Sequence, residues 1–198
     1  GTGSGTGSTG STDGTGSGTG TGSGSDGPAA PPPLAARDAH RLAQQATFGP
    51  TEALLALMQT QTAEQWLAAQ MASKLSRYSS GKGDAVHRNQ QATFFCDLPA
   101  YAGDHCWRDW FSTEPLVWDF YRNAVVNPDQ LRQRVAWALS QVLVVSGHAV
   151  SGTYGLRNFH NMLLDNAFGN YRELLRRVAL SPVMGEFLNN VNNDAAAP

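Results

Sequence analysis

Helix start and stop signals recur along this chain, and they constrain its fold more than any other feature of the sequence. The clearest set is NPDQLRQRVAWALSQVLVVS, residues 127–146. Asparagine can cap a helix, proline suits a first helical position, and an acid is favourable in the first turn. The apolar residues that follow recur at helical spacing. They predict a helix that buries a stripe made of Leu131, Val135, Ala138, Leu139 and Val142.

Short helices are also predicted where the apolar sequence begins. A helix over residues 34–47 should end at the Gly-Pro pair of residues 49–50, because proline restricts the residue before it and cannot continue the hydrogen-bond ladder. Thr51 can cap the next helix, residues 52–58, which carries an acid in its first turn.

Two further helices have recognisable N-terminal residues. Thr62 and Gln65 have the spacing of a capping box, which predicts a helix within residues 62–75. A longer helix should begin at Thr113, which can act as the cap before a glutamate and a proline, and end by residue 126.

The last part of the chain continues the pattern. A helix over residues 156–168 should end at Gly169, where a left-handed backbone is expected. Asn170 can cap the next helix, and Ser181 with Pro182 begins a final short one. About eight helices and no hairpin signature predict an all-α fold, an irregular multi-helix bundle.

The basic cluster Arg132, Gln133 and Arg134 lies where the central helix begins to pack. Arg134 is one residue from the predicted stripe, so its stem can cover apolar surface while the guanidinium reaches solvent or an acidic partner. A snorkelling flank is the simplest interpretation, and a buried ion pair or an anion site is the alternative.

The first residues differ sharply in composition. Residues 1–27 contain only Gly, Thr, Ser and Asp, so they offer no apolar side chain to offset the entropy of ordering and predict a disordered tether. A proline-rich linker follows. We therefore divide the chain into a tether and linker, residues 1–33, and a helical domain, residues 34–198, which is long enough for one core.

Charge and hydropathy exclude some classes of partner. The chain has 14 Lys and Arg against 16 Asp and Glu, a formal net charge of −2, which gives no field to attract nucleic acid. The sequence predicts no nucleic-acid binding, no cofactor and no transmembrane segment, since no apolar run is long enough to span a bilayer.

The two cysteines are Cys96 and Cys106, separated by nine residues. This spacing fits neither a redox CxxC pair nor a haem-attachment motif, and zinc would need further ligands. In an exported protein a local disulfide is the simplest interpretation. Free buried thiols and metal ligation are the alternatives.

Three segments, in this order, resemble one bacterial family. They are LAQQATFGPTEA, LRQRVAWALSQVLVVS and LLDNAFGNYRELLRRVALSPVMGEFL. They resemble the family catalogued as domain of unknown function 1800 (DUF1800), over roughly residues 37–190. The matched motif positions are Phe48, Gly49, Pro50, Arg132, Arg134, Gln141, Asn166, Phe168, Gly169, Asn170 and Pro182.

The resemblance implies a mostly helical bacterial protein that is usually exported, with no established activity, cofactor or catalytic residue. Family members normally continue for hundreds of residues, so the chain is expected to be an N-terminal portion. A site shared with the rest of such a protein would then be incomplete here.

Candidate catalytic residues are few. Arg134, His160 and Asp165 are weak candidates for acid–base or anion chemistry. His160 and Asp165 lie five residues apart, about 140° around a helix, so they do not share a face. Asn166 and Asn170 are expected to satisfy backbone groups at a joint between two helices.

The sequence offers candidates for two other chemistries. Asp104 and His105, beside a cysteine, are weak candidates for a metal, against the simpler interpretation of a surface loop. A set of aromatic residues could line a carbohydrate-binding groove, although aromatics at helical spacing are usually core. These residues are Tyr101, Trp107, Trp110, Phe111, Trp118 and Tyr121.

These features favour an exported helical module with a non-catalytic assembly or binding role. Its partner would be an unidentified protein or polymer of the envelope. The expected location is periplasmic, outer-membrane-anchored or extracellular. The alternative is an N-terminal half of an exported hydrolase-like enzyme whose active site is completed by residues beyond 198.

Overall fold

The computed structural model describes residues 1, 31–83, 95–101, 103, 105–150 and 152–190. Every regular element in these ranges is a helix, which confirms the predicted all-α fold. The chain separates into residues 1–31 and residues 32–198. The predicted tether, residues 1–27, lies outside the described residues apart from Gly1.

The second unit contains nine α-helices among its described residues. They are α1 (Ala36–Ala46), α2 (Glu52–Met58), α3 (Ala63–Ala72), α4 (Cys106–Phe111), α5 (Glu114–Val126), α6 (Gln130–Val142), α7 (Thr153–Asp165), α8 (Tyr171–Ala179) and α9 (Pro182–Phe187). Two 3-10 turns, η1 (Phe95–Asp97) and η2 (Pro99–Tyr101), precede α4. Within the described ranges, none of these helices is long and apolar enough to cross a bilayer.

Three predicted N-caps are confirmed. The side chain of Thr51 accepts a hydrogen bond from the N–H of Leu54 at 3.2 Å. Thr62 and Gln65 form both bonds of the capping box. Asn170 Oδ1 accepts from the N–H of Glu173 at 3.2 Å. Each bond satisfies a donor that the first helical turn leaves unpaired.

Other helix ends differ from the prediction. Thr113 makes no capping bond, and Ser112 Oγ accepts from the N–H of Glu114 instead. The central helix α6 begins at Gln130 rather than after Asn127, so the expected first-turn proline lies before it. Gly169 does not have positive φ, because α7 has already ended at Asp165 and Gly169 N–H closes a turn onto Asn166.

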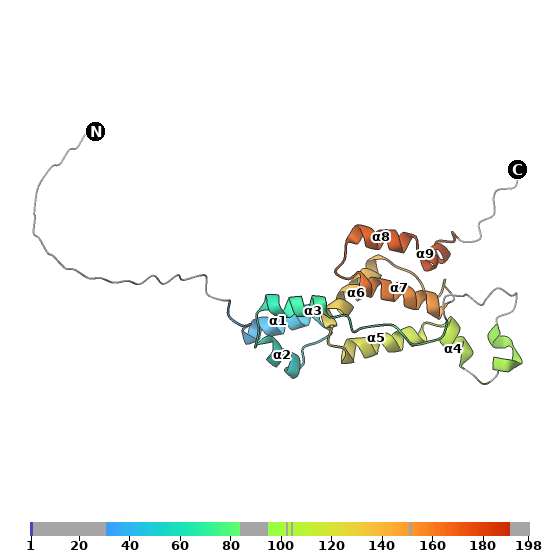
Figure 1. The fold of residues 1–198 in the computed structure, drawn as a ribbon, viewed down its shortest axis with the longest axis horizontal. Coiled ribbons are helices and arrows are strands. Elements are labelled where there is room, and N and C mark those ends of the chain that lie inside the picture. Colours follow the sequence, from blue (N-terminus) through green and yellow to red (C-terminus); the bar gives the residue numbers. More distant parts are fainter. Residues whose placement is uncertain (2–30, 84–94, 102, 104, 151, 191–198) are drawn as a thin grey trace, which may run out of the picture. The chain divides into compact units, whose positions relative to one another are not determined.

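The helices pack around two apolar clusters. Figure 1 shows the arrangement of the helices. Helices α1, α2 and α3 enclose the smaller cluster, in which Met58 and Trp66 are fully buried. The larger cluster lies among α5 to α9 and is centred on Phe159, Leu163 and Leu164 of α7. Helix α6 contacts α1, α3, α5 and α7, so it joins the two clusters.

The buried face of α6 is not the predicted stripe. Its buried residues are Arg132, Gln133 and Ala136, whereas Val142 is 70% exposed and Ala138 is also exposed. The prediction was wrong for Ala138 and Val142, whereas Leu131 and Leu139 are partly buried and pack against the two apolar clusters. The buried polar residues of this face have polar partners: Arg132 donates to carbonyls at the C-terminal ends of α3 and α7, and Gln133 donates to the hydroxyl of Tyr78.

Cys96 and Cys106 form a disulfide with a Cα–Cα distance of 5.6 Å, which confirms the predicted bond. The bond joins η1 to the first residue of α4. Helix α4, which the sequence did not predict, contacts α5 and α7. The disulfide therefore ties η1 to the helical domain.

Candidate functional site

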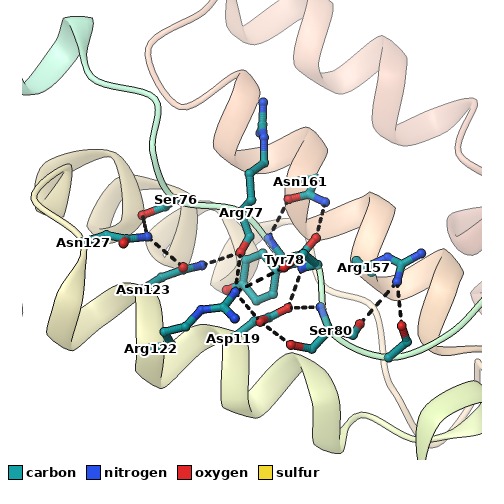
Figure 2. A network of polar contacts seen from close by, with 12 residues as sticks. Ser76, Arg77, Tyr78, Ser80, Asp119, Arg122, Asn123, Asn127, Arg157 and Asn161 are labelled. Atoms are coloured by element: carbon teal, nitrogen blue, oxygen red, sulfur yellow. Dashed lines mark hydrogen bonds and ion pairs between the residues drawn. The ribbon is translucent and has the colours of Figure 1, made fainter.

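A non-helical segment, residues 73–83, crosses α5, α6 and α7 after the end of α3. We name it the strap. Figure 2 shows polar side chains of α5 and α7 pointing at its backbone. Hydrogen bonds within the strap's own backbone do not hold it, so the surrounding side chains must satisfy its buried N–H and C=O groups.

Two fully buried carboxylates bind successive strap amides. The Oδ2 atom of Asp129 accepts from the N–H groups of Leu75 and Ser76, both at 2.8 Å. On α5, the Oδ2 atom of Asp119 accepts in the same way from Ser79 and Ser80, both at 2.6 Å. Bonds of this kind to an ionised acceptor are stronger than bonds between neutral groups.

Arg132, which is positively charged, binds backbone carbonyls instead of amides. Its Nε donates to the carbonyl of Ser73 at 2.6 Å and its Nη2 to Met71 at 2.7 Å, both at the end of α3. Its Nη1 donates to Leu164 in the last turn of α7 at 2.9 Å. The guanidinium also lies 4.9 Å from the ring centre of Phe168. A buried cation thus satisfies carbonyls at two helix C-termini, where the helix dipole favours positive charge.

The far end of the strap is held by α7. Arg157 donates to the carbonyls of Ser80, Gly81 and Gly83 at 3.3, 3.2 and 2.7 Å. Gly81 has φ of +83°, and a Cβ there would lie 2.6 Å from Thr153 Cγ2. This position requires glycine for both its backbone conformation and its close approach to α7.

Tyr78 connects the strap to the larger core. Its N–H donates to Asn161 Oδ1 at 2.9 Å, and its carbonyl accepts from Asn161 Nδ2 at 2.8 Å. Its ring, 7% exposed, lies 5.0 Å from that of His160. Gln133 Nε2 donates to the hydroxyl at 3.3 Å. Burial is the main cause that raises the pKa of this phenol.

Beside Tyr78 lies a cavity of about 300 Å³ between α5, α6 and α7, which we name the aromatic cavity. Its aromatic lining consists of Tyr78, Phe120, Tyr121, Trp137 and His160. Leu116, Val117, Val145 and Leu156 supply much of the aliphatic lining, with hydroxyls from Thr113 and Ser140. The volume is at the lower end of the range of about 300–1,000 Å³ that small-molecule sites occupy.

The electrostatics of this cavity are simple. The described residues that line it include no Asp, Glu, Lys or Arg. Desolvation by burial lowers the pKa of His160 from 6.5 to about 4, so its imidazole is neutral near pH 7. The lining therefore carries no full charge at neutral pH, and one neutral imidazole can donate or accept a hydrogen bond.

The comparisons with known proteins identify one family. Residues 41–198 match the model described as "Protein of unknown function (DUF1800)". The chain belongs to the DUF1800 family. No curated protein and no solved structure matches the chain.

In this DUF1800 chain the three candidate catalytic residues have separate surroundings. The Arg134 guanidinium lies 5.5 Å from the ring centres of both Phe48 and Trp137. Asp165 forms an ion pair with Arg77 at 2.6 Å, and both side chains are nearly half exposed. Of the three candidates, the structure places His160 alone in the cavity lining.

The predicted role of the two asparagines near the end of α7 is confirmed. Asn166 Nδ2 donates to the carbonyl of Met162 at 2.8 Å. Asn170 caps α8. Both asparagines therefore satisfy backbone groups at the α7–α8 joint, as local hydrogen-bonding side chains commonly do.

The candidate metal residues do not form a described site. Asp104 lies outside the described residues, and His105 is the exposed residue before α4. Over the ranges that the structure describes, no group of three His, Cys, Asp or Glu side chains is placed to hold a metal ion.

The predicted aromatic groove is divided in the structure. Trp107 packs against Phe111 with ring centres 5.0 Å apart, and its Nε1 donates to Asp97 at 3.3 Å. Trp118 lies under the Arg108 guanidinium at 5.1 Å. Tyr121, the remaining member on α5, lines the aromatic cavity instead.

An exposed apolar surface adjoins the mouth of the aromatic cavity. Val117, Tyr121 and Trp137 all line the cavity, and their side chains are 47%, 63% and 42% exposed. Other large apolar residues on α5 and α6 are exposed as well. They are Trp118, Val125, Val126 and Val142. Exposed apolar surface around a cavity is typical of interaction sites.

Sequence reasoning missed the residues that organise this region. Tyr78 lies in the polar stretch RYSSGKG, and Asp119 and Asp129 read as ordinary helix-surface acids. Asp119 and Asn123 lie on one face of α5, together with Leu116. A polar pair on the same face as an apolar residue was the available signal that this face meets backbone.

Proposed function

We propose that this DUF1800 chain is a non-catalytic binding module of an exported assembly. The aromatic cavity takes an uncharged apolar or aromatic group of a protein or polymer partner. The observation that carries the proposal is the cavity itself, which has an aromatic, uncharged lining and opens onto exposed apolar side chains.

The lining supports an uncharged ligand. A charged group placed there would lose hydration without gaining a counter-ion from the described lining, at a cost of several kcal/mol. An aromatic ring of a ligand would contact Phe120 and Trp137, and its binding would bury apolar surface of both the ligand and the cavity. His160 can hydrogen bond to one hydroxyl or carbonyl of the ligand.

The surroundings of the candidate catalytic residues support a binding role over hydrolysis. Arg134 stacks on two rings, and Asp165 pairs with Arg77 at the surface. An imidazole with a pKa of about 4, such as that of His160, is a weak general base near pH 7. The described contacts of His160 are with aromatic rings, Tyr78 and Phe159, and not with a carboxylate that would orient it.

Export is supported by the disulfide. Cys96–Cys106 is a local bond in a family without a known redox role, and such bonds persist in oxidising compartments. The Gly/Ser/Thr composition of residues 1–27 suits a linker between this domain and a point of attachment. Thiol labelling of fractionated native cells tests this, because a cytosolic, reduced protein contradicts export.

Calorimetric titration with three ligands of similar shape tests the binding proposal. Benzyl alcohol is uncharged, whereas benzoate and benzylammonium carry opposite charges. Benzyl alcohol should bind at least about tenfold more tightly than either ion. The reason is that a charged ligand loses its hydration on binding and finds no counter-ion in the lining. Equal binding of all three, or no binding of benzyl alcohol, contradicts the proposal.

A variant that fills the cavity locates the binding. Ala136→Leu extends a buried side chain of α6 into the aromatic cavity, and it should weaken benzyl alcohol binding by about tenfold or more. The control is Ala138→Leu, an exposed position on the same helix, which should bind as the unmodified chain does. Turnover of ester, glycoside or phosphate substrates that Ala136→Leu abolishes would instead favour a hydrolase.

A further inference from the structure

A second cavity, of about 650 Å³, lies between α7, α8 and α9. We name it the α7–α9 cavity. It shares no lining residue with the aromatic cavity, so an inference about it stands apart from the proposed function. Its volume is well inside the range of small-molecule sites, roughly 300–1,000 Å³.

The inner part of this cavity is apolar. Val150, Phe159 and Val183 line it and are 2%, 2% and 4% exposed. Met162 and Pro182 add further apolar lining. A hydrocarbon group placed against these side chains would be removed from water at a gain of about 25 cal/mol for each Å² buried.

The outer part carries charge of predominantly one sign. Arg176 and Arg177, in the last turn of α8, both line the cavity, whereas Glu186 of α9 is the single acid in the described lining. Both arginines remain substantially exposed, so they belong to the mouth rather than the floor. The lining therefore has a net charge of +1 beside an apolar interior.

The arginines are only partly engaged by other groups. Glu173 accepts from Arg177 Nε at 3.1 Å and lies 3.8 Å from Arg176 Nη1. In the described contacts Arg177 therefore uses Nε, which leaves its two Nη groups for another acceptor. A guanidinium edge of this kind can bind a carboxylate through two parallel hydrogen bonds.

We propose that the α7–α9 cavity binds a single-chain amphiphile with one acidic group. The hydrocarbon chain lies against Val150, Phe159 and Val183, and the carboxylate lies at Arg176 and Arg177. A cationic amphiphile is disfavoured because two guanidinium groups lie at the mouth, whereas Glu186 is the single acid of the described lining and Glu173 is already paired with the arginines. No covalent chemistry is involved.

Calorimetric titration below the critical micelle concentration tests the charge preference. Laurate and dodecyltrimethylammonium have chains of equal length and opposite head-group charge. Laurate should bind at least about tenfold more tightly, whereas inorganic phosphate, which lacks a chain, should not bind measurably. Equal affinity for the two amphiphiles, or tighter binding of the cation, overturns the proposal.

Charge variants test the mouth. Arg176→Gln and Arg177→Gln should each weaken laurate binding by roughly two- to fivefold, which is the range for an exposed charge contact. Glu186→Gln should strengthen it, because the opposing charge is removed. Arg172→Gln is the control, since Arg172 is an exposed arginine of α8 outside the lining, and it should leave affinity unchanged.

A blocking variant separates binding in the cavity from adsorption to the arginine surface. Asn158 lines the cavity and is exposed on α7, so Asn158→Trp should obstruct the mouth without disturbing the core. Laurate affinity should fall by about tenfold or more, while far-ultraviolet circular dichroism stays unchanged. Unchanged affinity in a folded Asn158→Trp variant overturns a site in this cavity.

Discussion

The strap and the aromatic cavity share Tyr78 and adjoin the same three helices, yet they use polar residues in opposite ways. Around the strap, buried ionic side chains such as Asp119, Asp129 and Arg132 each pair with several backbone groups. Around the cavity, the described lining has no full charge at neutral pH. The comparison teaches that buried charge in this molecule serves structure, while the uncharged surface is suited to binding.

The two arginines of the basic cluster on α6 illustrate the point. Arg132 is 3% exposed and binds three carbonyls, and Arg134, two residues later, stacks on aromatic rings at the surface of the same helix. A basic cluster in the sequence suggests an anion site. Here its buried member, Arg132, instead donates to unpaired carbonyls at the C-terminal ends of α3 and α7, which lie against α6.

The largest expected effect comes from removing the buried guanidinium. Arg132→Gln should lower the free energy of unfolding by about 4 kcal/mol, because one buried and two partly buried carbonyls lose a charged donor. Urea denaturation measures the loss. Arg134→Gln is the matched control and should cost only about 1 kcal/mol, as expected of a partly exposed guanidinium that contacts two rings. Equal losses of stability in the two variants would contradict the structural role of the buried arginine.

The cavity predicts a specific response to acid. The pKa of His160 is about 4 in the folded chain and 6.5 for an ordinary histidine, so the unfolded chain binds this proton first. Stability from this group is complete above pH 6.5 and falls as the pH drops towards 4, by about 3 kcal/mol. Unfolding measured at pH 7 and pH 4 should therefore show a smaller acid loss in His160→Gln than in the unmodified chain.

His148→Gln is the control for that experiment. His148 is exposed in the loop before α7, so its replacement should leave the pH dependence of unfolding unchanged. If His160→Gln and His148→Gln lose the same stability between pH 7 and pH 4, the neutral cavity lining is refuted.

Loss of a buried carboxylate that binds the strap should lower the free energy of unfolding more than loss of an exposed carboxylate. Asp119→Asn leaves an amide where Oδ1 and Oδ2 accept from Ser79, Ser80 and Arg122, and it should cost about 2 to 3 kcal/mol. Asp165→Asn, which removes an exposed pair with Arg77, should cost less than about 1 kcal/mol. Thermal unfolding of both variants measures the two losses of stability. A larger loss for Asp165→Asn than for Asp119→Asn would contradict the prediction.

The smallest expected loss comes from the disulfide. Replacing Cys96 and Cys106 by serine should lower stability by about 2 kcal/mol, since the closed loop is short. Because Lys82 N–H donates to the carbonyl of Asp109 in α4 at 2.7 Å, the far end of the strap should also lose amide protection. Hydrogen exchange checks this, and unchanged protection of Lys82 would show that α4 holds without the bond.

Local features of the fold were predictable and non-local ones were not. The caps at Thr51, Thr62 and Asn170 depend on residues within one helical turn, so their spacing in the sequence was sufficient. The buried face of α6 depends on the strap, which lies more than fifty residues earlier in the chain. Hydrophobic periodicity alone therefore selected Val142 and Ala138, which are exposed.

The candidate site was predictable only in fragments. His160 and Tyr121 were singled out separately, for chemistry and for stacking, and the fold brings both to one cavity. Tyr78 was missed because its surroundings in the sequence are polar. Its burial follows from Asn161, which pairs with the N–H and the carbonyl of Tyr78 itself, and from Asp119, which accepts from the next two amides.

Nuclear magnetic resonance during a titration with benzyl alcohol tests directly whether the aromatic cavity binds an uncharged ligand while the strap stays in place. We expect the ring signals of Tyr78 and His160 to shift until the site is saturated, while the amides of Ser79 and Ser80 keep their protection from exchange. That result would place an uncharged ligand in the cavity with the strap intact. Unmoved ring signals, or strap amides that lose protection as the ligand binds, would contradict the separation of the binding surface from the charged scaffold.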